Sequence, residues 1–215
     1  MPPKYLKKAN IPMLVVFLIW NVAIFLVASN GGMATFWTGV RAHIAELKAR
    51  DSLFVFLSPL ILAIASGLLP SSWKDTLVFW RIKDTLPGCR AFSELVKRDP
   101  RIDELFIAKQ FPTGHGSPRE QNTVWYKWYK EVQNQETVRE SHKQFLLNRD
   151  LTGIAYLFSV FGSWALFLFG SSASNVITYT VITVLQFLIF SLIARNHGNR
   201  FVCNVIVEYQ HKNDH

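Results

Sequence analysis

Four runs of apolar residues without a charged side chain dominate the hydropathy pattern of this chain. They cover residues 11–29, 52–70, 151–170 and 176–194. A helix needs about 20 mostly apolar residues to cross the hydrocarbon layer of a membrane, and each run is close to that length. Because a lone segment in lipid must satisfy its own backbone polar groups, the pattern predicts four transmembrane helices.

The stretches between these runs predict the remaining parts of the chain, which are a head (1–10), an outer loop (30–51), a long insert (71–150), an outer turn (171–175) and a tail (195–215). In the outer loop, apolar side chains recur at helical spacing from Phe36 to Leu47. This pattern predicts an amphipathic helix that either lies on the membrane surface or packs on the ends of the spans.

The insert reads as mostly helical, with one exception. A helical stretch begins near Gln121 and meets no glycine or proline before the third apolar run. Residues 76–83 and 200–210 are rich in β-branched and aromatic residues, which favour strands. A lone strand is not stable, so residues 200–210 need either residues 76–83 or a neighbouring subunit as a partner. We expect the two segments to pair in a small two-stranded sheet. The predicted fold class is therefore an all-α membrane protein with this small sheet beside the insert.

The distribution of basic residues predicts the orientation in the membrane. The head, the insert and the tail hold 20 of the 23 Lys and Arg residues, and four crossings place these three parts on one side. Cytoplasmic segments keep an excess of Lys and Arg, so we expect both termini in the cytoplasm and the chain in the cell inner membrane. Arg41, Lys48 and Arg50 of the outer loop oppose this rule mildly.

The net charge of +8 also invites a nucleic-acid interpretation, but membrane topology explains it better. The insert carries 14 basic and 11 acidic residues, without a long basic run. We therefore expect the lipid bilayer to be a partner, and we expect no direct contact with nucleic acid.

The two cysteines, Cys89 and Cys203, both fall on the predicted cytoplasmic side, where thiols stay reduced. Neither has a second cysteine or a histidine at the spacing of metal ligands. The sequence predicts no disulfide, no metal site and no cofactor.

Few residues suggest catalysis. The four apolar runs contain no ionisable acid or base, which argues against a pump, a proton-coupled transporter or an intramembrane protease. His115 lies in a glycine-containing loop and His142 on the apolar face of a helix. We expect no enzyme; a membrane enzyme acting on lipid or a small molecule through these histidines is an alternative.

Some polar and small residues inside the runs are candidates for helix packing or for a pore. Asn21 and Gln186 lie near the middle of the first and fourth runs, where they suit an interhelical hydrogen bond or a polar pore lining. Pro59 predicts a kink in the second run. Ser159 and Ser163 lie one helical turn apart on the third run and permit close approach of another helix.

The aromatic segment of the insert is its most distinctive feature. At helical spacing, one face carries Trp125, Trp128, Tyr129 and Val132. Along an unbroken helix Trp128 would lie about 35 Å from the third run, too far to reach lipid. These side chains therefore pack on the insert's own core, on a sister subunit or on a soluble partner, for which Trp and Tyr are typical anchors.

Together these features favour a non-enzymatic, homo-oligomeric membrane protein that recruits or signals to a cytosolic protein partner. In layout alone, the chain resembles small four-pass proteins of bacterial anti-phage defence, and this resemblance implies a membrane sensor or scaffold. A pore-forming or membrane-disrupting effector is the second hypothesis, with Asn21, Pro59 and Gln186 on its path.

Overall fold

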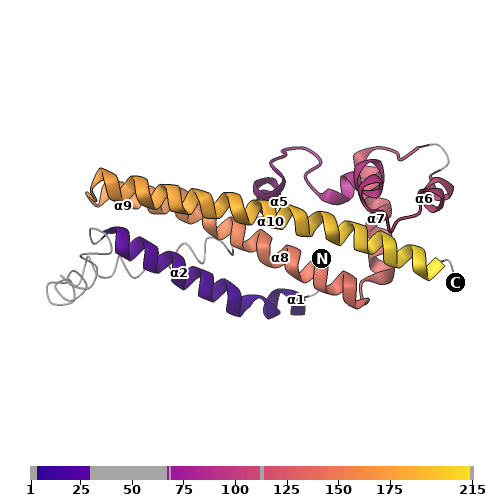
Figure 1. Cartoon of the computed structure of the whole chain (residues 1–215), viewed down its shortest axis with the longest axis horizontal. Helices are drawn as coiled ribbons and strands as arrows, with labels where there is room; N and C mark the ends of the chain where they lie inside the picture. The colour runs from indigo at the N-terminus through magenta and orange to yellow at the C-terminus, as the bar shows by residue number, and fades with distance from the viewer. Residues whose placement is uncertain (1–3, 30–66, 68, 112–113, 214–215) are drawn as a thin grey trace. The chain divides into compact units, whose positions relative to one another are not determined.

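The computed structural model describes residues 4–29, 67, 69–111 and 114–213, and every regular element in this part of the chain is helical (Figure 1). The α-helices are α1 (Lys4–Ala9), α2 (Ile11–Ser29), α5 (Ser71–Phe79), α6 (Glu104–Gln110), α7 (Pro118–Val132), α8 (Glu136–Leu157), α9 (Ser163–Leu168) and α10 (Ala173–Asn213). Short 3₁₀ or π-helical turns are η1 (Pro87–Arg90), η2 (Ala91–Leu95), η3 (Val96–Arg98) and η4 (Phe158–Gly162). The all-α class is confirmed for the described residues.

Three helical stretches in the described part of the chain are long and apolar enough to cross a membrane, namely Ile11–Ser29, Glu136–Leu168 and Ala173–Asn213. The second stretch comprises α8, η4 and α9, and it becomes free of charged residues after Asp150. The uncharged part of α10 ends where Arg195 follows Ala194. The run predicted at 52–70 lies outside the described residues, except for residues 67, 69 and 70, and so does the predicted helix in the outer loop.

The chain divides into two compact units. Unit 1 comprises the described parts of residues 1–7, 75–149 and 191–215. Unit 2 comprises the described parts of residues 8–74 and 150–190. The chain passes between the two units within α8 and again within α10, because each of these helices contributes residues to both.

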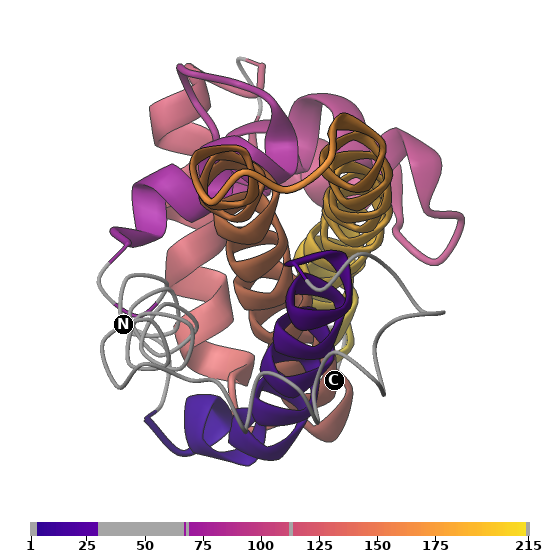
Figure 2. The same cartoon turned by 90° about the vertical axis from the view of Figure 1, so that its left-hand side faces the viewer.

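Unit 2 holds its helices together through small side chains and a small buried cluster that includes Phe25, Leu166 and Tyr179. In the two cartoon views, α9 and the first half of α10 run side by side (Figures 1 and 2), and Thr180 Oγ1 donates a 2.8 Å hydrogen bond to Ser163 Oγ between them. Gly162 receives the buried Tyr179 ring so closely that an added Cβ would overlap the phenol oxygen. Gly170, with φ +73°, ends the short α9 and starts the turn into α10.

The outward side chains of unit 2 are large and apolar. Phe167 is 71% exposed, and Ile19 and Trp164 are each 62% exposed. Exposed apolar residues on this scale are typical of a surface that faces lipid rather than water.

Unit 1 has an aromatic core formed by α7, the first part of α8, the second part of α10 and the turns η1 to η3. Phe92 is fully buried and meets the Trp128 ring edge-on at 4.9 Å, and Trp128 stacks on Tyr209 at 4.4 Å. Helix α7 begins with a capping box, in which Ser117 and Glu120 satisfy each other's backbone N–H groups. These contacts fix α7 against the second part of α10.

The two-stranded sheet predicted from residues 76–83 and 200–210 is wrong. Residues 76–79 form the end of α5, and residues 200–210 continue α10. The buried positions of the tail have helical rather than alternating spacing, as shown by Phe201, Val202, Val205 and Ile206. Strand propensity is a weak preference, and the burial of one helical face in the core of unit 1 overrides it.

The helix predicted to run from Gln121 to the third apolar run is interrupted. Helix α7 ends at Val132, where a turn closes with a 3.0 Å hydrogen bond from Gln135 N to Val132 O, and α8 begins at Glu136. The turn lets α7 and α8 pack on each other, so the aromatic face of α7 meets the core of its own unit.

Candidate ligand-binding pocket

Unit 1 contains a pocket of about 170 Å³ with aromatic walls. Its lining comes from the segment around η1 and from α7, α8 and α10, and consists of Leu86, Pro87, Gly88, Asn122, Trp125, Tyr126, Tyr129, His142, Phe145 and Phe201. Binding pockets are typically apolar with a few placed polar groups, and those for drug-sized ligands measure about 300–1,000 Å³. The smaller volume here suits a ligand of one or two rings.

The aromatic wall is held by ring-to-ring contacts between three helices. Trp125 and Tyr129 of α7 stack at 5.9 Å, and Phe201 of α10 meets both edge-on, at 5.3 Å and 5.5 Å. His142 of α8 stacks on Phe201 at 4.4 Å. Because each ring packs against its neighbours, the wall is largely in place before a ligand binds.

A polar pair lies within this wall. The Tyr129 hydroxyl and His142 Nδ1 are hydrogen-bonded at 3.2 Å. Burial, together with the positive charge of Arg149, lowers the pKa of His142 to about 4. The imidazole is therefore neutral at neutral pH, which suits it to hydrogen bonding in an apolar pocket.

Asn122 supplies a second polar group. Its Oδ1 atom is buried and accepts no hydrogen bond from the described residues. A buried acceptor without a partner costs free energy, about 1–3 kcal/mol. A ligand with an N–H or O–H donor would satisfy it.

Gly88 makes the approach of η1 to α7 possible. A Cβ added to Gly88 would overlap Asn122 Oδ1 and would lie 2.9 Å from a ring carbon of Trp125. Only glycine therefore lets the η1 backbone form this side of the pocket without displacing Asn122 or Trp125.

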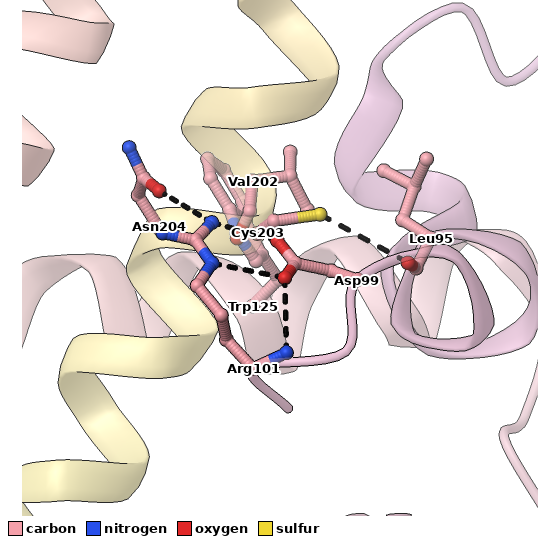
Figure 3. A network of polar contacts seen from close by, with 7 residues as sticks. All are labelled: Leu95, Asp99, Arg101, Trp125, Val202, Cys203 and Asn204. Atoms are coloured by element: carbon pink, nitrogen blue, oxygen red, sulfur yellow. Dashed lines mark hydrogen bonds and ion pairs between the residues drawn. The ribbon is translucent and has the colours of Figure 1, made fainter. Parts of the chain in front are cut away.

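Trp125 is hydrogen-bonded to α10 beside a polar network (Figure 3). The Trp125 indole N–H donates to Val202 O at 3.3 Å. Arg101 donates to both carboxylate oxygens of Asp99, at 2.9 and 2.7 Å, and to Asn204 Oδ1 at 2.9 Å. The Arg101 guanidinium lowers the pKa of Asp99, so this ion pair persists well below neutral pH.

Cys203 adjoins the same network (Figure 3), with its thiol 3.9 Å from Leu95 O. Burial raises the pKa of the Cys203 thiol to about 12, which leaves it protonated and weakly reactive. Cys89 is also buried and free. The described residues contain no cluster of three or more side chains suited to hold a metal ion.

The four aromatic-face residues predicted from the sequence come together in unit 1. Trp125 and Tyr129 line the pocket, whereas Trp128 and Val132 lie deeper in the core. All four are buried, with exposed fractions of 8% or less. Packing within the same unit accounts for their placement, and their role in binding a partner or a sister subunit stays a prediction.

The candidates inside the apolar runs are distributed through unit 2. Asn21 is fully buried and donates from Nδ2 to Phe17 O of its own helix at 2.9 Å. Oδ1 of Asn21 and Oε1 of Gln186 accept no hydrogen bond from the described residues. Ser159 bonds the Tyr156 carbonyl, whereas Ser163 bonds Thr180 of α10. Pro59 lies outside the described residues.

Sequence reasoning placed only part of this pocket. His142 was identified on an apolar helix face, and Trp125 and Tyr129 as an aromatic pair. Asn122, Gly88 and Phe201 were missed, since the first two carry no recognisable motif and the tail with Phe201 was assigned to a strand. His115 lies in the loop before α7 and does not line the pocket.

Comparisons of the chain with protein-family models, with curated proteins and with solved structures find no match. The geometry of the pocket is therefore the basis for the functional assignment.

Proposed function

We propose that this chain is a non-enzymatic membrane protein in which unit 1 binds a small, largely apolar ligand and signals its presence to a cytosolic protein partner. The aromatic pocket of unit 1 carries this proposal. Its packed rings offer an apolar surface to the ligand, and the unsatisfied acceptor of Asn122 in the lining favours a ligand with a donor group.

The composition of the lining favours binding over catalysis. Among the described lining residues, the imidazole of His142 is the one side chain that titrates near neutral pH in its unperturbed state, and no carboxylate accompanies it. An acid–base mechanism needs groups with a pKa near the working pH, whereas the pKa of His142 is lowered to about 4. A buried neutral histidine is better suited to orient a ligand.

The proposed topology has four spans, at residues 11–29, 52–70, 151–170 and 176–194, with both termini in the cytoplasm of the inner membrane. Three apolar helices support the first, third and fourth spans. The uneven distribution of Lys and Arg supports the orientation. Unit 1 would then be the cytoplasmic part of a sensor or scaffold, as in bacterial anti-phage defence.

We also propose a homo-oligomer, which the exposed apolar surface of unit 2 supports. Interhelical packing in lipid relies on close approach at small residues and on hydrogen bonds. Gly162 and Ser163 use such contacts within the chain, whereas large apolar residues such as Trp164 remain exposed beside them and offer area to a second copy.

A ligand-binding experiment tests the pocket directly. Indole is a suitable probe because it is small and aromatic and carries one N–H donor. We expect saturation-transfer NMR on the full-length protein in neutral detergent to detect indole binding, and we expect Asn122→Leu to weaken it about tenfold because a charge-free hydrogen bond to a buried acceptor is lost. Thr123→Leu, at the exposed neighbouring position, is the matched control. Equal binding to all three proteins would refute the proposed pocket.

A second measurement tests the recruitment of a partner. Tyr126 lines the pocket and is 39% exposed, so a photo-crosslinking residue at this position reports on proteins that contact the pocket rim. We expect a discrete crosslinked species in intact cells, and a change in its yield when Asn122 is replaced by leucine. A chain that purifies as a monomer and gives no crosslinked protein would contradict the signalling role.

A further inference from the structure

A second cavity in unit 1, of about 160 Å³, has four arginines among its eight lining residues. Four of its lining residues are Arg81, Arg90, Arg98 and Arg195, which we call the arginine cluster. They come from four separate places, namely the segment after α5, the turns η1 and η3, and α10. The fold therefore brings together four guanidinium groups that are far apart in the sequence.

The charges in this cavity are not balanced. Glu94 is the one carboxylate in the described lining, and it pairs with Arg90 Nε at 3.6 Å while remaining 42% exposed. The described residues form no ion pair with Arg81 or Arg98. Positive charge in the cavity thus exceeds what the described residues neutralise.

The guanidinium groups affect one another. Burial lowers the pKa of Arg90, and the positive charges of Arg81 and Arg195 lower it further. Burial and the charge of Arg81 likewise lower the pKa of Arg195. Groups of like charge held together raise the energy of the unoccupied site, and a bound anion relieves this repulsion.

Two members of the arginine cluster are held in place. Arg195 donates from Nε and Nη2 to Val78 O, at 3.3 and 3.1 Å, and lies over the Trp80 ring at 4.3 Å. Arg90 donates from Nη1 to Asp84 O at 3.4 Å. A guanidinium has five N–H donors, so both arginines keep donors for a ligand after these bonds are made. Holding the donors in advance reduces the entropy lost on binding.

Asn199 adds an unsatisfied group to the same cavity. Its Oδ1 is buried and accepts no hydrogen bond from the described residues. An amide whose oxygen and nitrogen are exchanged by a half-turn would instead present an N–H donor. An anion in the cavity would favour that orientation.

Apolar groups beside the arginine cluster point to the source of the anion. Trp80 is 52% exposed and Ile82 is 91% exposed, on either side of Arg81. Arg195 directly follows the uncharged part of α10. The contact between Arg195 and the Trp80 ring brings the segment after α5 to the end of this uncharged part. Exposed Trp and Ile side chains next to basic residues at such a position are typical of the membrane–water interface.

We propose that the arginine cluster binds a phosphate group, carried by an anionic lipid headgroup or by a free phosphate compound. Guanidinium groups bind phosphate oxygens in pairs, and the several oxygens of a phosphate match donors that converge from different directions. A single carboxylate offers only two oxygens and would leave part of the cluster unpaired.

The test uses the full-length protein in neutral detergent with two probes. Native mass spectrometry measures retention of phosphatidic acid against phosphatidylcholine, and calorimetry measures binding of inorganic phosphate. The double variant Arg81→Gln/Arg98→Gln removes the two exposed members of the cluster, so the core of unit 1 remains intact. Arg119→Gln, an exposed arginine of α7 outside the cluster, is the matched control.

We expect the double variant to lose at least about tenfold in affinity, since two guanidinium groups that would donate charge-assisted hydrogen bonds to the phosphate are removed. Preferential retention of phosphatidic acid that the double variant loses supports the site and identifies a lipid source. Phosphate binding that the double variant loses supports the site and identifies a soluble source. Binding of neither probe, or equal weakening by Arg119→Gln, overturns the proposal.

Discussion

The two units of this chain differ in how they place their large apolar side chains. Unit 1 packs rings such as Phe92 and Trp128 into one large core, whereas unit 2 has a small buried cluster around Tyr179 and exposes many large apolar side chains. Water drives rings into a core, but it supplies no such force between helices that are surrounded by lipid. The buried aromatic core of unit 1 therefore suits water, whereas the exposed apolar surface of unit 2 suits lipid.

The contrast is sharpest between two phenylalanines. Phe92 of unit 1 is fully buried and contacts the Phe111 and Trp128 rings, at 4.6 and 4.9 Å. Phe167 of unit 2 is 71% exposed. A phenylalanine side chain thus packs in the core of unit 1 but lies on the surface of unit 2.

Matched truncation of these two phenylalanines gives the largest expected effect. Phe92→Ala should destabilise unit 1 by about 3–5 kcal/mol, because it leaves a cavity among aromatic rings. Phe167→Ala should change stability by no more than about 0.5 kcal/mol, as for other exposed positions. Thermal unfolding in detergent, followed by circular dichroism, measures both. Equal losses would show that the two units are not built for different solvents.

Acidification should affect unit 1 selectively. The pKa of His142 is about 4 in the folded chain and 6.5 without perturbation. Between these pH values, His142 binds a proton in the unfolded chain but stays neutral in the folded chain. The contribution of His142 to the free energy of unfolding is therefore fully present above pH 6.5. It is lost as the pH falls towards 4, by about 3 kcal/mol in all. Chemical denaturation at a series of pH values measures this slope.

The control for the pH effect is a pair of histidine variants. His142→Phe keeps an aromatic ring next to Phe201 and should flatten the slope. His211→Phe, at an exposed position of α10, should leave it unchanged. Part of the slope will remain in His142→Phe, because burial also lowers the pKa of His197. A slope that is the same in all three proteins would contradict the buried neutral state of His142.

In unit 2, a single methyl group should matter at Gly162. Gly162→Ala places a Cβ on the Tyr179 hydroxyl and 2.9 Å from two of its ring carbons, which should cost about 1–3 kcal/mol. The nearest atom to a Cβ at Gly153 of the same unit is 3.7 Å away, so Gly153→Ala should be neutral or slightly stabilising. Adding Tyr179→Phe to Gly162→Ala should restore part of the loss. No difference between the two glycine variants would exclude close packing at Gly162.

The smallest effect is expected from the hydroxyl contact in unit 2. Ser163→Ala removes one of the two partners of Thr180 Oγ1 and leaves the bond to Val176 O. It should cost about 0.6 kcal/mol, the average for hydrogen bonds between membrane helices. Ser174→Ala, at an exposed position in the first turn of α10, serves as the reference. Unfolding in mixed micelles measures the difference. A loss several times larger would mean that hydrogen bonds, rather than close packing, hold unit 2 together.

The sequence was sufficient to locate three apolar helical stretches, but not for their full bounds or for the pocket. The runs 11–29, 151–170 and 176–194 coincide with three helical stretches that are long and apolar enough to cross a membrane. The second stretch begins at Glu136 and the third ends at Asn213, so both extend beyond the runs into unit 1. The tail was misread because residues 200–210 have strand propensity, whereas packing against unit 1 decides their conformation.

The pocket illustrates a different limit. His142 and Trp125 have the residue types and the helical spacing of a buried face, and the sequence shows this. Their meeting with Phe201 and Gly88 depends on contacts between segments up to about a hundred residues apart, for which no local pattern exists. The arginine cluster was hidden in the same way, because its members are scattered between positions 81 and 195.

The absence of a side chain at Gly198 also restricts how this chain can evolve. A Cβ at this position of α10 would lie 2.8 Å from the Phe79 ring and 3.1 Å from the Phe145 ring. Every single-base change that replaces the glycine introduces either a residue with a Cβ or a stop codon. Selection should therefore remove such changes unless the ring at position 79 or 145 shrinks in the same lineage. Covariation of these three positions is the signature that diverging descendants of this chain should carry.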